Sequence, residues 1–278
     1  MSAHSTPQGD SQSVLVGRLA LVLPAYNEAE GIPGFLDELM QALHPLCADL
    51  STVVVDDHST DGTGKVLDAY AHEHPELRVV HAEENRGHGP TALAGYRTAL
   101  ALRPDLIVFV DGDGQFLGDD VARAVVLGIR SGADVVHGVR TGRTDPWYRK
   151  LLTGALGVAL AVVAGGPIPD VNTPLRVYRP TALRALLSLV PTRALVPHVH
   201  FSLAESRMGM RRTQLRVRSI PRRGATTQGS MWGGTRVPRL PPARLRLFVA
   251  RALGELWRVS LRPGAGSRAR SLARGMAR

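Results

Sequence analysis

Two aspartates set two residues apart close an apolar run in the middle of the chain, LIVFVDGDGQ from Leu106 to Gln115. A run of Leu, Ile, Val and Phe that stops at Asp-Gly is typical of a strand buried on both faces, so Asp111 and Asp113 are expected at its carboxyl end. Ligands bind at that edge of an open parallel sheet, where two carboxylates and the Gln115 amide would suit Mg²⁺ or Mn²⁺ carrying a diphosphate. Gly112 would let phosphate approach the backbone closely. A plain polar turn is the alternative.

Three further apolar runs precede this one. Arg18 to Leu23 stops at Pro24, which cannot continue a central strand. Thr52 to Val55 runs into two acids, and Leu77 to Val80 leads to the glycine-rich NRGHG. Apolar residues at helical spacing follow the first run, and loops that open helices follow the others. This alternation predicts an α/β fold in which helices flank both faces of a mostly parallel sheet.

The carboxyl ends of parallel strands meet at one edge, so the four strand ends are expected to line one crevice. They are Pro24 to Glu28, Asp56 with Asp57, Asn85 to Gly89, and Asp111 to Gln115. The glycines before Gly89 relax the backbone ahead of a helix whose free N–H groups would face phosphate. For Asp56 and Asp57, capping of the loop that follows them is the alternative.

Composition sets wider limits. The chain has 278 residues, 44% of them hydrophobic, which is enough for one large domain or a domain with an appendage. The single Cys47 excludes an intramolecular disulfide framework and fits a reducing compartment. The net charge of +10 is uneven, because the region after Asp170 is rich in arginine, and this predicts an anionic partner surface. Met1 to Ser13 shows no apolar signal segment.

Four motifs carry a family resemblance. LPAYNEAEGI, VVVDDHSTDGT, NRGHGPTALAGY and VDGDGQF, in this order and spacing, resemble the inverting family 2 glycosyltransferases of the GT-A fold. They are most similar to the branch that contains dolichol- and polyprenyl-phosphate mannose or glucose synthases, and the resemblance continues more loosely to about Thr227. It implies a Rossmann-like sheet, a GDP- or UDP-sugar donor, and Mg²⁺ or Mn²⁺.

The resemblance also assigns site residues. Asp57 would meet the nucleotide base with Asp56 beside it, and Gln115 would be a further metal ligand. His58 and His88 stand where the family has other residues and are interpreted as tolerated loop substitutions. The floor and edge of the nucleotide pocket would be Pro24, Ala25, Tyr26 and Glu28, with Gly87 in the following loop, and the metal and nucleotide sugar would be held by Asp111, Gly112 and Asp113.

Later arginines extend this predicted site. Arg140, in HGVR, resembles the arginine of the family's G-x-R, which contacts the sugar nucleotide or acceptor phosphate; a solvated surface arginine is the alternative. DVNTPLRVYRP resembles the D-x-x-x-G-F-R-x-F-R stretch, with Pro174 in place of the glycine. There Asp170 matches an acid near the acceptor, and Arg176 and Arg179 match basic positions.

PRRGATTQGS resembles the R-x-G-G-x-S loop that closes over the pyrophosphate, although Ala225 and Thr227 replace Gly and Ser. Arg222 is the best match to the phosphate-contacting arginine, with Arg223 as the second choice. An ordinary basic surface loop is the alternative.

Several stretches suggest a membrane surface. Arg149 and Lys150 lie beside Trp147 and Tyr148, as in a headgroup layer. Leu151 to Pro169 is apolar but broken by glycines, which favours a buried or half-immersed hairpin over a span.

The tail begins with an amphipathic helix, Arg244 to Ser260, for which membrane binding and packing on the catalytic domain both remain open. Its predicted apolar face consists of Leu245, Phe248, Val249, Ala252, Leu253, Leu256 and Val259. The sequence thus divides into a disordered N-terminus at 1–15, a GT-A domain at 16–230, an amphipathic helical appendage at 231–262 and a basic disordered tail at 263–278.

The predicted reaction is inverting sugar transfer to a polyprenyl phosphate by a peripheral enzyme at the cytoplasmic membrane face. A lipid phosphate is already anionic and needs no strong base, whereas a hydroxyl acceptor would need one, for which Asp170 is the candidate. The alternatives are transfer to a soluble or protein-bound hydroxyl and an inactive basic membrane- or nucleic-acid-binding module. Few aromatic residues lie among the basic ones, so no nucleic acid partner is expected.

Overall fold

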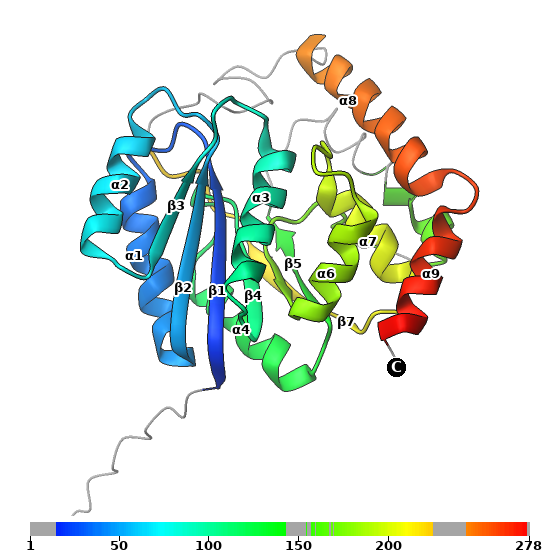
Figure 1. Cartoon of the computed structure of the whole chain (residues 1–278), viewed down its shortest axis with the longest axis horizontal. Coiled ribbons are helices and arrows are strands. Elements are labelled where there is room, and N and C mark those ends of the chain that lie inside the picture. The colour runs from blue at the N-terminus through cyan, green and yellow to red at the C-terminus, as the bar shows by residue number, and fades with distance from the viewer. Residues whose placement is uncertain are drawn as a thin grey trace, which may run out of the picture.

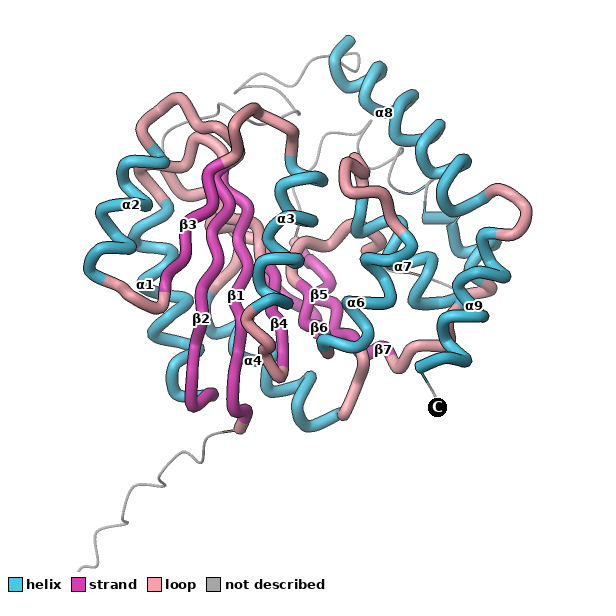
Figure 2. The backbone as a smooth tube through the Cα atoms, viewed as in Figure 1, coloured by secondary structure: helices cyan, strands magenta, loops and turns pink. Residues whose placement is uncertain are grey.

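The computed structural model describes residues 15–142, 154, 157–158, 160–166, 168, 170–224 and 243–276. Figure 1 shows the chain and Figure 2 its helices and strands. The elements, in chain order, are β1 Val16–Ala25, α1 Ile32–Leu43, η1 His44–Leu46, β2 Cys47–Asp56, α2 Thr63–Glu73, β3 Leu77–His81, α3 His88–Ala101, β4 Leu106–Phe109, α4 Gly118–Ser131, β5 Val135–Thr141, β6 Arg176–Tyr178, α6 Pro180–Leu189, α7 Pro197–Arg207, β7 Arg212–Arg218, α8 Ala243–Leu256, η2 Trp257–Leu261 and α9 Ala265–Met276.

Seven strands form one sheet in the order β3-β2-β1-β4-β6-β5-β7. All pairings are parallel except those of β6, which runs antiparallel to both β4 and β5. The predicted α/β fold with a mostly parallel sheet is therefore confirmed. Because β1 to β4 are parallel, their carboxyl ends lie at one edge, as the sequence predicted.

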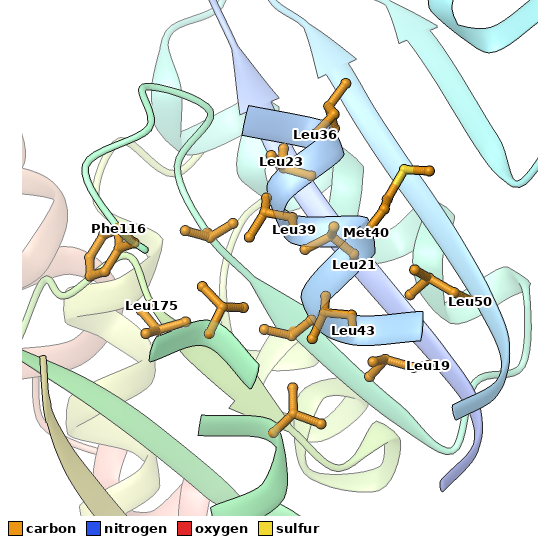
Figure 3. Close-up of a cluster of buried hydrophobic side chains, with 14 of the residues drawn as sticks. Leu19, Leu21, Leu23, Leu36, Leu39, Met40, Leu43, Leu50, Phe116 and Leu175 are labelled. Carbon is orange, nitrogen blue, oxygen red and sulfur yellow. The ribbon is translucent and has the colours of Figure 1, made fainter. Parts of the chain in front are cut away.

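Alternation along β1 divides the core in two. Leu19, Leu21 and Leu23 point to the face covered by α1, α2 and α4. Figure 3 shows them along α1, with Leu23 near Leu36 and Leu19 near Leu43. The intervening residues of β1 point to the face covered by α3, α6 and α7. Apolar packing on both faces fixes the register of the strands, since a slip by one residue would exchange the two faces.

The C-terminal helices lie beside α6 and α7 (Figure 1). The expectation of disorder at 263–278 is wrong for most of that stretch, because α9 occupies Ala265–Met276. Its composition is basic and glycine-rich, but Ala269 is buried and α9 packs on α6, α7 and η2, contacts that composition alone does not reveal.

Some predictions fall outside the described residues. They concern residues 1–14, the Trp147 and Tyr148 segment, much of Leu151 to Pro169, the Ala225 and Thr227 positions, and the proposed boundary at 230–231. Every helix in the described parts of the chain is too short or too polar to span a bilayer.

Candidate active site

The carboxyl edge of the sheet brings Asp111 beside the end of β1. The backbone continues alongside β1 beyond β4, because the Val110 N–H donates to Val22 O at 3.0 Å and the Gly112 N–H donates to Pro24 O at 3.1 Å. A Cβ on Gly112 would lie 2.7 Å from Pro24 O, so this position requires glycine for the backbone approach itself.

The two aspartates of this loop have different surroundings. His88 Nε2, at the start of α3, lies 2.6 Å from Asp111 Oδ1. Asp113 Oδ1 accepts from the Gln115 N–H at 3.2 Å. Burial, followed by the negative charge of Asp111, raises the pKa of Asp113 to about 6. Interpreting His88 as a tolerated substitution missed this contact, because the sequence alone does not show that the loop after β3 reaches the end of β4.

The donor set fits a divalent cation that brings other ligands with it. Among the residues described, no group of three or more His, Cys, Asp or Glu side chains could hold a metal alone. Asp111 and Asp113 supply two carboxylates, and Mg²⁺ commonly binds through one or two carboxylates plus phosphate oxygens and water. Burial and the negative charge of Asp111 both raise the pKa of Asp113, and a dication at this position would offset both effects by favouring the carboxylate.

Glu28 and Arg222 form the other wall of the site. Arg222 donates to both carboxylate oxygens of Glu28, through Nε at 3.3 Å and through a closer contact from the terminal nitrogen. Burial raises the pKa of Glu28 to about 7, although Arg222 works in the opposite direction. Arg222 also lies near enough to Asp113 to lower its pKa. Both acidic groups therefore share one cationic neighbour.

Arg223 faces away from this cluster. It pairs with Glu38 at 2.6 Å, and its guanidinium carbon lies 5.1 Å from the Phe35 ring centroid. Its backbone N–H donates to Asp113 O at 3.1 Å, so this segment lies along the aspartate loop. The geometry favours Arg222 over Arg223 as the arginine that faces the site.

Asp56 and Asp57 both order loops. Asp57 is buried, and its two oxygens accept from the Arg86 and Gly87 N–H groups, each at 2.8 Å. Asp56 Oδ1 accepts from the Ser59 N–H at 3.1 Å. The capping alternative, which concerned the loop that follows the two acids, thus applies to Asp56, whereas Asp57 orders the Arg86–Gly87 loop after β3. A contact between Asp57 and a base remains a prediction.

Arg140 and Asp170 form a two-pronged ion pair. Nε and Nη2 of Arg140 donate to the two Asp170 oxygens at 2.8 and 3.0 Å, and each side chain is only 9% exposed. The alternative of a solvated surface arginine is therefore wrong.

The two later arginines lie elsewhere. Arg176 is fully buried, where it donates to the Val171 and Thr173 carbonyls and pairs with Glu205 at 3.3 Å. Arg176 therefore holds the backbone of the segment that follows Asp170 in place from the buried side. Arg179 donates to Ala133 O at 3.1 Å, at the opposite edge of the sheet from Asp111. Because β6 runs antiparallel, the chain after it returns to the amino edge, and placing Arg179 in the site was wrong.

A C-terminal side chain also reaches the vicinity of the site. Glu255 of α8 accepts from the Leu195 N–H at 2.9 and 3.0 Å and contacts His200 Nε2 at 3.0 Å. A Cβ on Gly89, the residue after His88, would lie 2.2 Å from Ala194 O and 2.6 Å from Leu195 O, so this turn packs directly on the start of α3. No feature of the sequence indicated this connection between the tail helix and α3.

The family comparison covers most of this arrangement. The family described as "Glycosyl transferase family 2" matches residues 20–187. An undecaprenyl-phosphate mannosyltransferase of Micrococcus luteus is 29% identical over 211 residues, which are 74% of this chain and 84% of that protein. An undecaprenyl-phosphate 4-deoxy-4-formamido-L-arabinose transferase of Aeromonas hydrophila is 29% identical over 67% of this chain, which spans only 56% of that longer protein.

Solved structures share the fold. Glucosyl-3-phosphoglycerate synthase of Mycobacterium tuberculosis, in complex with Mn²⁺, UDP-glucose and glycerol 3-phosphate, gives a TM-score of 0.60 at 20% identity over 88% of this chain and 81% of that one. A Pyrobaculum calidifontis mannosyltransferase with GDP-mannose and Mn²⁺ gives 0.54 at 22% identity over 93% and 73% of the two chains.

Proposed function

Because the chain belongs to glycosyl transferase family 2, we propose that it transfers a sugar from a GDP- or UDP-sugar to a polyprenyl phosphate, with inversion at the anomeric carbon. The observation that carries the choice of acceptor is the similarity to an undecaprenyl-phosphate mannosyltransferase over 84% of that protein. The enzyme would work as a peripheral protein at the cytoplasmic face of an anionic membrane.

The aspartate loop would bind the diphosphate of the donor. Asp111 and Asp113, with Gln115, would hold Mg²⁺ or Mn²⁺, which when bound neutralises charge on the departing nucleoside diphosphate. His88 would keep Asp111 in place through its contact with Oδ1. The N–H groups at the start of α3 lie beside His88, where the amino end of a helix favours negative charge.

Arg222 would release the Glu28 carboxylate and bind the diphosphate of the donor in its place. It is paired with Glu28 in the structure, and we propose that it turns to the diphosphate when the donor binds. Glu28 would then lose a partner that lowers its pKa, which already stands at about 7. Glu28 should therefore take up part of a proton on donor binding at pH 7. Calorimetric titration in buffers of different ionisation enthalpy measures this uptake, and Glu28→Gln should abolish it.

The acceptor side needs no strong base if the acceptor is a phosphate. Asp170 is ion-paired with Arg140 and is therefore better suited to positioning that arginine than to removing a proton. Arg140 would face the acceptor phosphate or the sugar nucleotide. The oxygen of a lipid phosphate is already anionic at neutral pH and can attack the anomeric carbon directly.

The base contact has its own test. Asp57→Ala should weaken nucleotide binding by about 1–3 kcal/mol if Asp57 accepts a hydrogen bond from the base. Because Asp57 also accepts from two backbone N–H groups, the comparison should include Asp56→Ala, which disturbs a neighbouring loop cap. Equal losses in both variants, or none in Asp57→Ala, would assign the base to other residues.

Transfer itself is tested with radiolabelled GDP-mannose and UDP-glucose and three acceptors in detergent. We expect label in the organic phase with undecaprenyl phosphate and none with undecaprenol, which lacks the anion. Asp113→Asn is the inactive control. A new labelled product in the aqueous phase with glycerol 3-phosphate, separated from the unreacted donor, would favour a soluble acceptor. Glycerol 3-phosphate is the compound bound with UDP-glucose in the M. tuberculosis structure. No transfer to any acceptor, with an intact fold, would favour an inactive binding module.

A further inference from the structure

Exposed apolar side chains gather in two segments of the described chain. Among the large hydrophobic residues that are exposed, Val158, Val162 and Val163 lie in the 157–166 segment, and Leu247, Leu253 and Trp257 lie in α8 and η2. Only two others, Leu117 and Leu272, lie elsewhere in the parts of the chain that are described. Single exposed apolar residues need no explanation, but a group drawn from two adjacent segments does.

The two segments are adjacent because their inner sides share one small core. Leu160 from the first and Leu256 from α8 are both buried, and they pack in one cluster with Val199 and Leu203 of α7. Outward from this cluster, Val162 is 79% exposed and Trp257 is 60% exposed. Both segments thus turn an apolar side to α7 and a second apolar side to solvent.

The outward side of α8 is also cationic. Residues 243–276 contain eight arginines and a single acid, Glu255. Glu255 is turned inward to Leu195 and His200, so it does not offset the charge of the outer face. None of Arg246, Arg251 and Arg258 forms an ion pair with a residue that the structure describes.

Apolar and arginine side chains alternate on the outer face of α8 and η2. Arg246, Leu253 and Trp257 recur at intervals of seven and four residues, so they share one stripe. Leu247 and Arg251, four residues apart, form a neighbouring stripe. Aliphatic and indole groups interleaved with arginines match the acyl boundary and the anionic headgroups of a bilayer, whereas a folded protein partner would leave several arginines to be desolvated.

We propose that the outer face of α8 and η2, together with Val158, Val162 and Val163, is a docking surface for an anionic lipid bilayer. This differs from the apolar face predicted for the helix, because Leu245 and Leu256 of that face are buried, and Leu256 packs in the cluster with α7. Of the predicted set, Leu253 is 52% exposed and joins the docking surface. The proposal deepens the proposed function by placing the enzyme on the surface that carries its acceptor.

The test is flotation of the full-length protein with vesicles of phosphatidylcholine alone or mixed with phosphatidylglycerol. We expect flotation only with the anionic vesicles, and release by high salt, which screens the attraction. Arg251→Gln/Arg258→Gln should lower partitioning about 30-fold, as expected for two arginines near an anionic surface. The charge-matched control is Arg130→Gln/Arg184→Gln, whose exposed arginines lie on α4 and α6.

The apolar contribution has a parallel test. Leu253→Gln/Trp257→Gln should reduce flotation, and the control Leu272→Gln changes an exposed leucine of α9. Equal losses in test and control variants, or no flotation of the wild type, would overturn the docking surface. So would vesicle-independent dimerisation that the Leu253→Gln/Trp257→Gln variant abolishes, because a second copy would then cover the surface.

The proposed reaction and the docking surface can be tested independently of each other. The docking variants should keep transfer to undecaprenyl phosphate in detergent, where no bilayer is needed. Flotation without transfer would refute the reaction alone, and transfer without flotation would refute the docking surface alone.

Discussion

Replacing Glu255 by Gln tests whether the C-terminal helix is part of the site's architecture. The Glu255 carboxylate accepts from the N–H groups of Leu195 and Val196, at 2.9 to 3.4 Å, and contacts His200 at 3.0 Å. Hydrogen bonds to a charged group each contribute about 1.5–3 kcal/mol, and Gln keeps the shape but loses the charge. We expect Glu255→Gln to weaken the docking of α8 by about 2 kcal/mol.

Hydrogen exchange measures this effect directly. A loss of about 2 kcal/mol corresponds to about 30-fold faster exchange in segments that open when α8 undocks. The faster exchange should appear in α8, η2 and the turn at Leu195, and it should extend to Gly89, because that turn lies against the start of α3. The control is Glu83→Gln, whose carboxylate is 94% exposed.

The same contact predicts a pH dependence. Burial works to raise the pKa of Glu255, but hydrogen bonds from His200 and from the Leu195 N–H outweigh it, so the pKa lies below its ordinary 4.5. A lowered folded-state pKa adds stability that is complete above that ordinary value and is lost as the pH falls through the folded-state pKa. The difference between wild type and Glu255→Gln should therefore persist at pH 6 to 8 and disappear only below about pH 4.5. Unchanged exchange in α8, or an equal increase in β1, would refute the reasoning.

Three other predictions concern the site and its support. Asp113→Asn should abolish Mn²⁺ binding in calorimetry while leaving the circular dichroism spectrum unchanged, and retained binding would remove the metal role. Gly89→Ala should destabilise the chain by about 1–3 kcal/mol in thermal melts, since its Cβ would meet Ala194 O, and an unchanged melting temperature would contradict that contact. Glu205→Gln should cost about 3–5 kcal/mol by leaving Arg176 buried without its counter-ion, and chemical denaturation measures the loss.

The sequence predicted the local parts of this structure and missed those set by tertiary contacts. Apolar runs that lead into Asp56 and Asp111 correctly indicated parallel strands with polar ends at one edge, because strand period and turn residues are local signals. The expected stop at Pro24 was wrong, because β1 continues through Pro24 to Ala25 and pairs there with Val55 and Asp56 of β2. Matching arginines to a motif placed Arg179 at the wrong edge, because spacing carries no information about strand direction. Similarly, arginines and glycines suggested disorder for α9, where the burial of Ala269 against other helices decides the outcome.

The contact between His88 and Asp111 was missed for a related reason. A histidine in a glycine-rich loop has no periodic partner in the sequence, and its role depends on how β3 and β4 are placed in the sheet. The choice between Arg222 and Arg223 also needed the structure. Both follow the same proline, and only the side-chain directions place Arg222 beside Glu28 and Arg223 beside Glu38.

The insertion of β6 between β4 and β5 has a consequence for the order in which the protein folds during synthesis. Among the described strands, β2, β3 and β4 can each pair as soon as they leave the ribosome, because each has a neighbour that precedes it in the chain: β1 for β2 and β4, and β2 for β3. β5 cannot, since both of its neighbours, β6 and β7, come later in the chain. Until Arg176–Tyr178 is made, one edge of β4 and both edges of β5 expose unpaired backbone groups, which can pair with other chains. The half of the sheet made of β1 to β4 can therefore form early. The half that carries Arg140 joins it only after the three-residue strand β6 has been made.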